Sequence, residues 1–388
     1  MFSTRTRWDL RPNRLSRLLA AKRAAGARVI DLTETNPTRA GLRCPEELLA
    51  LLARPAGRVY DPAAFGIAPA REAVATDFAR RGARVKPERI LLSASTSEAY
   101  GFLFKLLCDP GDEILVPRPG YPLFEYLAAL EAVRVRGYAL DHDGSWRIDL
   151  DGLRSAVSSR TRAIVVVTPG NPTGAYLAEA ERDALETLAA ERDIALVSDE
   201  VFSDFAFGGV DRRPPSLAHD GPALAFTLGG LSKSCGLPQL KLAWTAVSGP
   251  AERRREALER LEVVADTYLS VSTPVQLATP EILARLDDLQ APVRERTRLN
   301  LEALRARLDA RSPASLLEPE GGWSAVLRVP ATISEEERVT RLLEERDVHV
   351  HPGYFFDFPR EAYIVVSLLA DPATFGEGAD RVLASLVL

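Results

Sequence analysis

The sequence predicts an α/β fold with two parts. The first is a large domain with a mostly parallel sheet and helices on both faces. The second is a smaller α+β domain formed by the N- and C-terminal segments. Two observations support this prediction. From about residue 90 to 250, short apolar runs alternate with helix-forming stretches, which is typical of a parallel sheet. After residue 250, long Arg- and Glu-rich helical stretches precede several short strands, so a second unit follows.

The length of the chain fits this division. Its 388 residues exceed what one ordinary hydrophobic core organises. We predict that residues 1–45 are an N-terminal segment of the small domain. Residues 46–272 are then the large, ligand-binding domain, and residues 273–388 are the small C-terminal domain.

Apolar runs, caps and turns predict the individual elements. Asn13 can cap a first helix that carries Leu15, Leu18 and Leu19. The continuous apolar run at 163–167 is typical of a strand covered on both faces. Strands are expected at 29–32, 90–92, 113–116, 163–167, 194–197, 224–228, 323–329, 348–350 and 363–368. Further helices are expected at 70–81, 99–107, 123–131, 178–192, 251–269 and 274–310, after Ser334, and at 376–388.

The composition excludes several classes of function. The chain is 46% hydrophobic and 27% charged, with a net charge of −5 and intermixed acidic and basic residues. It therefore offers no basic stripe for nucleic acid and no polybasic patch for a membrane surface. Three widely spaced cysteines and four scattered histidines argue against a disulfide framework and a metal site. We expect a cytoplasmic protein that acts on small molecules.

Polar or aromatic residues follow five of the predicted strands. Each has an ordinary structural interpretation, such as a helix cap, a turn or simple packing. In open α/β sheets, however, ligands bind at the carboxyl ends of the strands, so we expect these side chains to meet at one edge. The hydroxyl-rich segment 93–99 can also cap a helix and present N–H groups to an anion. The five positions are Ser95, Tyr121, Asn171, Asp199 and Lys233.

Lys233 stands out because the chain avoids lysine. Of 49 basic residues only five are lysines, and two of these, Lys233 and Lys241, lie within residues 224–244. Arginine replaces lysine as a surface charge but stays protonated, whereas lysine can form a Schiff base with a carbonyl. An aromatic aldehyde cofactor with a phosphate tail needs such a lysine, a carboxylate at its ring nitrogen, a stacking ring and an anion site.

Three motifs in the chain resemble those of the class I/II aminotransferases, which are pyridoxal-phosphate enzymes of fold type I. They are Thr-Pro-Gly-Asn-Pro-Thr-Gly at 168–174, Asp-Glu-Val-Phe at 199–202 and Leu-Ser-Lys at 231–233. Asn171 and Asp199 are 28 residues apart, and Asp199 and Lys233 are 34 apart, as in that family. The resemblance extends from about residue 30 to the C-terminus.

The resemblance implies pyridoxal 5′-phosphate as cofactor. It implies that Lys233 binds the cofactor covalently and moves the substrate proton. Asp199 would pair with the pyridine nitrogen, Asn171 would contact the ring oxygen, and Tyr121 would stack on the ring. A tyrosine from the neighbouring subunit would reach the phosphate, so a homodimer is implied. The full set of implied cofactor-binding residues is Ser95, Thr96, Ser97, Tyr121, Asn171, Asp199, Ser232, Lys241 and, from the neighbour, Tyr60.

The sequence departs from the family pattern at several positions. Phe202 stands where a tyrosine often contacts the ring oxygen. Gly230 replaces a common serine and Lys241 a common arginine near the phosphate. Val365 stands where an arginine usually binds the substrate carboxylate, and it cannot form that ion pair. The candidates for substrate binding are then Asn36, Arg118 and Arg39, with Arg360 as a further possible cation.

These features predict an aminotransferase that moves an amino group between an amino acid and a 2-oxo acid by a ping-pong mechanism. The missing arginine keeps another cofactor-dependent reaction open: a β-elimination, a decarboxylation or an oxidation. A non-catalytic regulatory protein that binds the same cofactor is the alternative from a different class. The substrate side chain is not identified by the sequence.

Overall fold

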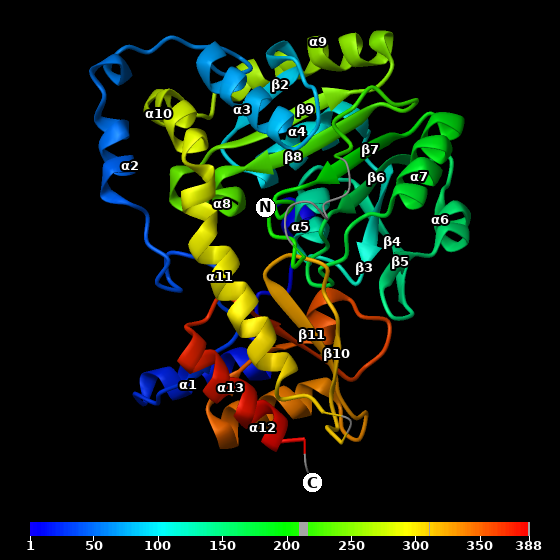
Figure 1. Cartoon of the computed structure of the whole chain (residues 1–388). Helices are drawn as coiled ribbons and strands as arrows, with labels where there is room; N and C mark the ends of the chain where they lie inside the picture. The colour runs from blue at the N-terminus through cyan, green and yellow to red at the C-terminus, as the bar shows by residue number, and fades with distance from the viewer. Residues whose placement is uncertain (209–215, 310, 387–388) are drawn as a thin grey trace.

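An eight-stranded sheet forms the centre of the larger part of the molecule (Figure 1). The computed structural model describes residues 1–208, 216–309 and 311–386. The strand order is β2-β9-β8-β7-β6-β3-β4-β5. Strands β4, β3, β6, β7 and β8 pair in parallel, whereas β9 runs antiparallel to β8 and β2, and β5 antiparallel to β4. The strands are β2 (Ile90–Ser93), β3 (Glu113–Arg118), β4 (Arg134–His142), β5 (Trp146–Ile148), β6 (Thr161–Val167), β7 (Ala195–Asp199), β8 (Ala225–Gly230) and β9 (Ala243–Ser248).

Helices cover both faces of this sheet because its central strands are apolar on both sides. Val165 and Phe226 pack in a core with residues of α4, α5 and α9, whereas Ile164 and Leu196 pack in another with residues of α6 and α7. The predicted α/β class with a mostly parallel, doubly covered sheet is confirmed. The helices of this part are α2 (Glu46–Ala50), α3 (Ala68–Arg80), α4 (Thr96–Leu107), α5 (Leu123–Leu130), α6 (Leu150–Ala156), α7 (Glu179–Arg192), α8 (Leu231–Ser234), α9 (Ala251–Tyr268) and α10 (Thr273–Ala284).

A smaller antiparallel sheet forms the other part, in the order β10-β11-β14-β13. The N-terminal strand β1 pairs in parallel with β12, which places Ile30 opposite Val348. In Figure 1, α1 lies beside α12 and α13 at this end of the molecule. The N-terminal segment thus completes the small α+β unit, as expected. The elements are α1 (Arg14–Ala24), β1 (Ile30–Asp31), β10 (Ser315–Leu317), β11 (Ser324–Arg328), α12 (Glu335–Arg346), β12 (Val348–His349), β13 (His351–Pro352), β14 (Tyr363–Ser367) and α13 (Pro372–Ala384).

The long helix α11 (Leu286–Arg305) joins the two parts (Figure 1). Gln290 donates hydrogen bonds to Asp204 (3.0 Å) and to the Ser234 carbonyl (2.9 Å) in the large part. Almost three turns later, Asn300 donates to the Leu368 and Ala370 carbonyls in the small part. The sequence predicted one helix over 274–310, but Arg285 leaves the helical conformation (ψ 20°), so α10 and α11 are separate helices.

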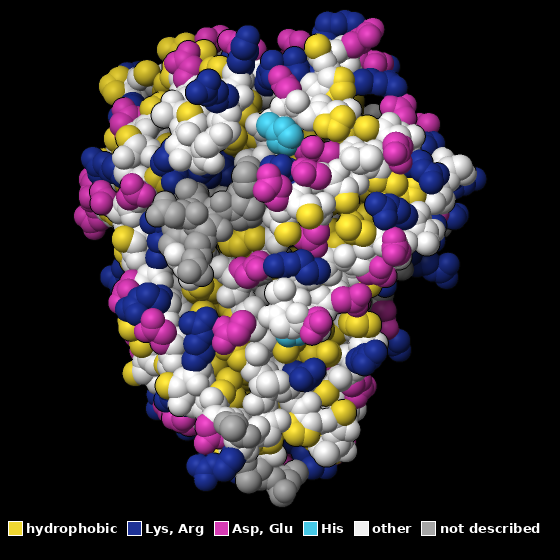
Figure 2. All heavy atoms as spheres, turned by 45° about the vertical axis from the view of Figure 1, so that its right-hand side comes forward, with side chains coloured by type: hydrophobic (Ala, Val, Ile, Leu, Met, Phe, Trp, Pro, Cys, Tyr) yellow, Lys and Arg dark blue, Asp and Glu magenta, His cyan; other side chains and the backbone are white. Residues whose placement is uncertain are grey.

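The surface carries charges of both signs. Figure 2 shows basic and acidic side chains interspersed over one face, with apolar atoms between them. Within the described residues, no helix combines the length and apolar character needed to cross a membrane. The same residues hold no cluster of side chains suited to a metal ion.

Candidate active site

A cavity of about 440 Å³ lies where the carboxyl ends of the large-sheet strands meet the small sheet. Residues that follow β2, β3, β6, β7 and β8 form one side, and residues of β11, β13 and β14 form the other. Side chains that are far apart in the sequence meet here because parallel strands end at the same edge. The predicted site residues that line the cavity are Ser95, Thr96, Ser97, Tyr121, Asn171, Asp199, Ser232, Lys233 and Lys241.

Asp199 is the last residue of β7 and is buried. Its carboxylate accepts a hydrogen bond from the Tyr100 hydroxyl at 3.1 Å and one from the Val201 backbone N–H at 3.2 Å. Burial raises the pKa of Asp199 to about 6, although these hydrogen bonds and Lys233 favour the ionised form. A desolvated carboxylate of this kind can hold a proton on a basic nitrogen placed against it.

Tyr100 is a candidate that the sequence does not reveal. It lies within the apolar helix α4, where an aromatic residue is readily explained by packing, and its ring does make edge contact with Phe124 (centroids 5.3 Å apart). Burial raises the pKa of the Tyr100 hydroxyl well above its usual value, so it remains a hydrogen-bond donor to Asp199.

Lys233 lies in α8, the single helical turn that follows β8. Its amine nitrogen is 5.2 Å from the centre of the Trp323 ring and 5.6 Å from that of Phe202. Burial lowers the pKa of this amine, against the attraction of Asp199 and Glu34. Within the described part of the chain, no carboxylate forms an ion pair with it. A desolvated amine loses its proton more readily, and the neutral amine is the form that attacks a carbonyl.

The N-terminus of α4 forms the candidate anion-binding end of the cavity. Ser95 caps the helix, since its hydroxyl accepts a hydrogen bond from the Glu98 N–H at 3.1 Å. Thr96 and Ser97 follow in the first turn and also line the cavity. A helix N-terminus carries partial positive charge and free N–H groups, and Lys241, which lines the same cavity, adds a full charge.

Close packing explains one departure from the family pattern. A side-chain carbon at Gly230 would lie 3.0 Å from the Ala243 side chain and 3.2 Å from the Leu242 carbonyl. A serine would therefore require the neighbouring strand β9 to shift. Lys241 and the hydroxyls at the α4 N-terminus are the groups that remain at this end.

The lining of the cavity also includes Tyr121, Asn171 and Phe202. Tyr121 is 43% exposed, so its ring is open to a ligand. Phe202 makes edge contact with Trp323, with centroids 5.2 Å apart, and offers no hydroxyl to a ring oxygen. The individual roles of these residues stay predictions.

Four predicted residues lie outside the lining of this cavity. Asn36 accepts hydrogen bonds from the backbone N–H and the hydroxyl of Thr38. The Arg39 side chain is 72% exposed and forms an ion pair with Glu34 (3.0 Å). Arg118 donates a hydrogen bond to Glu125 (3.1 Å). Tyr60 is exposed on the surface of the single chain.

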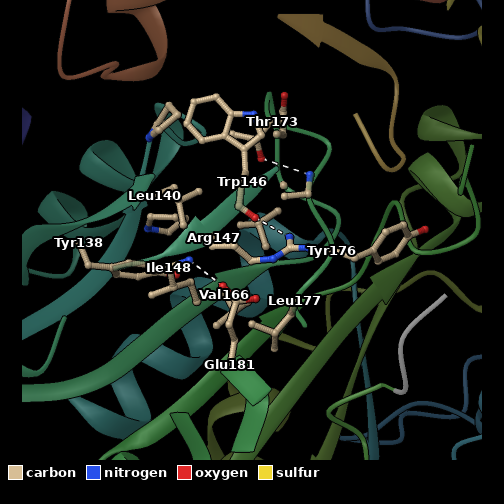
Figure 3. A pocket seen from close by; sticks show the side chains of 16 residues that line it. Tyr138, Leu140, Trp146, Arg147, Ile148, Val166, Thr173, Tyr176, Leu177 and Glu181 are labelled. Carbon is tan, nitrogen blue, oxygen red and sulfur yellow. Dashed lines mark hydrogen bonds between the residues drawn. The ribbon is translucent and has the colours of Figure 1, made fainter. Parts of the chain in front are cut away.

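A second hollow lies behind the 168–174 segment (Figure 3). Asn171 lines both spaces, so this segment separates them. The hollow measures only about 30 Å³, which is room for about one water molecule. The one carboxylate among the described residues that line this hollow is occupied locally, since Glu181 accepts hydrogen bonds from the Ile148 and Ala178 N–H groups. The larger cavity is therefore the candidate site.

The donor set of the larger cavity fits a pyridoxal phosphate group. It combines a buried amine without an ion-pair partner among the described residues, a buried carboxylate, an open aromatic face and a helix N-terminus with a lysine. A phosphorylated pyridine aldehyde would give each of these groups a partner. The amine would react with the aldehyde, the carboxylate would pair with the ring nitrogen, the aromatic face would stack on the ring, and the helix N-terminus and the lysine would bind the phosphate.

Comparison with known proteins points to one family. The model of the family described as aminotransferase class I and II matches residues 32–381. The chain is 30% identical over 257 residues to glutamate-pyruvate aminotransferase AlaA of Escherichia coli (strain K12). That match covers 65% of this chain and 63% of the relative, which is less than two thirds of the relative's length. Alanine aminotransferase of Mycobacterium tuberculosis (strain ATCC 25618 / H37Rv) is 27% identical over 347 residues, covering 87% of this chain and 80% of that protein.

Solved structures share the whole fold. Alanine aminotransferase from Pyrococcus furiosus superposes with a TM-score of 0.87 at 24% identity, covering 98% of both chains. A double mutant of Thermus thermophilus aspartate aminotransferase gives a TM-score of 0.84 at 25% identity, covering 100% of both chains.

Proposed function

This chain belongs to the class I and II aminotransferases, whose cofactor is pyridoxal 5′-phosphate, and we propose that it transfers an amino group between an amino acid and a 2-oxo acid by a ping-pong mechanism. The observation that carries the proposal is the meeting of Lys233, Asp199 and the α4 N-terminus in one cavity. The names of the relatives, which mention alanine, glutamate and pyruvate, support an amino acid and a 2-oxo acid as substrates.

Each residue of the cavity has a proposed task. Ser95, Thr96, Ser97, Ser232 and Lys241 would bind the phosphate. Asn171 would orient the ring, and Tyr121 would cover one of its faces.

Two residues would handle protons. Asp199 would hold a proton on the pyridine nitrogen, helped by the Tyr100 hydroxyl. The bound cofactor supplies a ring that takes up the negative charge left when the amino carbon loses its proton. The Lys233 amine, kept partly desolvated between Trp323 and Phe202, would take that proton and return it.

We further propose a homodimer, in which the exposed Tyr60 reaches the phosphate of the neighbouring subunit. A cytoplasmic location is part of the proposal. The free thiols of Cys44, Cys108 and Cys235 support it, because disulfides are rare in reducing compartments.

Absorption spectroscopy tests the proposed reaction. Adding an amino donor to the holoenzyme should remove the absorption band of the lysine-bound cofactor, and a 2-oxo acid should restore it. Release of free ammonia would instead indicate an eliminating enzyme. A band that no donor changes would indicate a binding protein.

A further inference from the structure

The small unit contributes an aromatic surface to the cavity. The 3₁₀ turn η7 (Gly353–Phe356) follows β13, and its last two residues, Phe355 and Phe356, line the cavity together with His351 of β13. The Phe355 ring stacks on the His351 ring, with centroids 4.8 Å apart and planes 5° apart. His351 and Phe356 make an edge contact, with centroids 5.6 Å apart. The three rings therefore form one continuous surface on this side of the cavity.

Phe355 has an exposed ring and no task in the proposed reaction. Among the described aromatic residues that line the cavity, only Tyr121 and Phe355 are strongly exposed, at 43% and 44%. Tyr121 is the ring that is proposed to cover the cofactor. His351 packs against one face of Phe355, and the remaining ring area is open to a ligand. Covering such area with an apolar group is favourable by about 25 cal/mol per Å².

The turn that carries Phe355 is fixed on both flanks. The carboxylate of Glu335, which is 2% exposed, accepts hydrogen bonds from the Tyr354 N–H (2.7 Å) and the Tyr363 N–H (2.8 Å). A side-chain carbon at Gly353 would lie 2.7 Å from that carboxylate, so a larger residue there would displace Glu335. The aromatic surface is therefore formed before a ligand binds, and little ordering free energy is lost on binding.

The turn also borders the residue that is proposed to cover the cofactor. The Gly120 N–H donates a hydrogen bond to the Phe356 carbonyl at 2.9 Å, and Gly120 directly precedes Tyr121. Phe356 packs in a small core with Val365, which supports the turn from behind. The aromatic surface thus lies beside Tyr121, in the cavity that would hold both the cofactor and the substrate.

His351 adds an uncharged ring to this surface. Burial lowers its pKa to about 4, the neighbouring His349 lowers it further, and Asp31 opposes the shift. The imidazole is therefore neutral at neutral pH, and its stacking on Phe355 brings no charge to the cavity.

We propose that η7 and His351 form the side-chain pocket of the active site, and that this pocket selects amino acids and 2-oxo acids with an aromatic side chain. The preference applies to both half-reactions, because both substrates bind in the one cavity. The inference depends on rings that this chain provides, and a neighbouring subunit can add further groups to them. It rests on the proposed amino transfer and names the substrate class of that reaction.

The overall reaction balances without another reactant. R–CH(NH₂)–COO⁻ and R′–CO–COO⁻ give R–CO–COO⁻ and R′–CH(NH₂)–COO⁻, in which the pocket binds R and R′ in turn. The carbon that loses the amino group is oxidised, and the carbon that receives it is reduced.

A series of amino donors tests the inference on the wild-type holoenzyme. We expect kcat/KM for loss of the cofactor band to be about 10- to 100-fold higher for L-phenylalanine than for L-alanine, the size expected for burial of a phenyl ring. Phenylalanine should also exceed L-leucine, because stacking of rings adds to area burial. In the other half-reaction, phenylpyruvate should restore the band more efficiently than pyruvate. A preference for alanine, leucine or glutamate over phenylalanine would overturn the inference and leave the proposed amino transfer intact.

Two neighbouring aromatic residues supply a variant and its control. Phe355→Ala removes the exposed ring and should lower the phenylalanine-to-alanine ratio of kcat/KM by about tenfold. Tyr354 lies in the same turn and is 43% exposed, but it does not line the cavity, so Tyr354→Ala should leave the ratio unchanged. An unchanged ratio in Phe355→Ala, or an equal fall in both variants, would contradict the proposed pocket.

A binding measurement separates the inference from the proposed function. Calorimetric titration of the wild-type holoenzyme should show that 3-phenylpropanoate binds about tenfold more tightly than propanoate, and Phe355→Ala should reduce this difference. Neither acid has an amino group, so the result needs no turnover. If no donor changes the cofactor band, the proposed function fails, and the titration still decides the inference: equal binding of the two acids overturns it.

Discussion

Burial has two effects on Asp199. It strengthens the pairing of the carboxylate with a protonated nitrogen, and it makes the ionised carboxylate unfavourable when no such nitrogen is bound. Its pKa is raised to about 6 from an ordinary value of 3.8. Between pH 3.8 and about pH 6, the Asp199 carboxyl is therefore protonated in the folded protein and ionised in the unfolded chain. The contribution of Asp199 to stability without cofactor should be greatest below about pH 4 and should be lost as the pH rises through 6.

Asp199→Asn measures this contribution. Between pH 4 and pH 7, the wild-type apoprotein should lose about 2 kcal/mol of unfolding free energy relative to the variant. Urea denaturation at both pH values checks it. The variant holoenzyme should also be folded but slow in removing the substrate proton. Equal pH dependence in both proteins would show that the Asp199 carboxyl is not desolvated as described.

Lys233 should carry the cofactor. It is the amine in the cavity with a lowered pKa, whereas Lys241 lies at the anion end. Borohydride reduction followed by peptide mapping should find the pyridoxyl group on Lys233. Lys233→Arg keeps the positive charge but cannot form the covalent bond, so turnover should be abolished. A label on Lys241 would contradict the assignment.

At the scale of elements, the start of α4 and the loop before β9 should act together as the phosphate site. Lys241→Met removes the full charge and leaves the helix N-terminus, so the dissociation constant for pyridoxal phosphate should rise by about tenfold. Fluorescence titration of the apoprotein measures it. Lys241→Arg, which keeps the charge, is the matched control and should stay close to wild type. Equal weakening in both variants would argue for a packing role.

Buried ion pairs link the C-terminal end of α3 to the residue that follows β7. Arg81, just after α3, lies 3.3 Å from Glu200 and 3.3 Å from Asp77, and all three side chains are at most 7% exposed. Arg81→Ala would remove the ion-pair partner of the buried Glu200, whereas Asp77 would keep its pair with Arg80 (2.8 Å), and it should cost about 3 to 5 kcal/mol of unfolding free energy. The exposed Arg255 offers the control: Arg255→Ala should leave denaturant midpoints unchanged. A loss of unfolding free energy well below this range for Arg81→Ala would contradict the prediction and indicate that water hydrates the remaining carboxylates.

At the scale of the whole molecule, the proposed homodimer would share each active site between two chains. Tyr60 is 70% exposed and lies outside the cavity of its own chain. If Tyr60 serves the neighbour, an inactive Lys233→Ala chain and an inactive Tyr60→Ala chain should regain activity when mixed, because one site of each heterodimer is intact. Turnover of purified heterodimers measures this. If purified heterodimers recover no activity, Tyr60 serves the site of its own subunit or contributes to no active site.

Much of the fold could be predicted because strong local patterns set it. The runs at 163–167 and 224–228 are apolar on both faces and became the central strands β6 and β8. β9 was not predicted, although its residues are apolar, because it follows the Lys233 segment directly and runs antiparallel. The break at Arg285 was missed because residues on both sides of it form helices, and only packing of α10 on α3 and of α11 along both units separates them. The predicted domain boundaries stay predictions.

The sequence by itself determined the family and predicted nine of the residues that line the cavity. Motif residues such as Asp199 and Lys233 follow strand ends, and parallel strands bring such residues to one edge whatever the rest of the chain does. Only the tertiary structure decided what surrounds them. The pKa shifts of Asp199 and Lys233 depend on burial, and Tyr100 meets Asp199 through helix packing. His351 lies beside Val365 because β13 and β14 pair across 10 residues of intervening chain, a contact that no local pattern encodes.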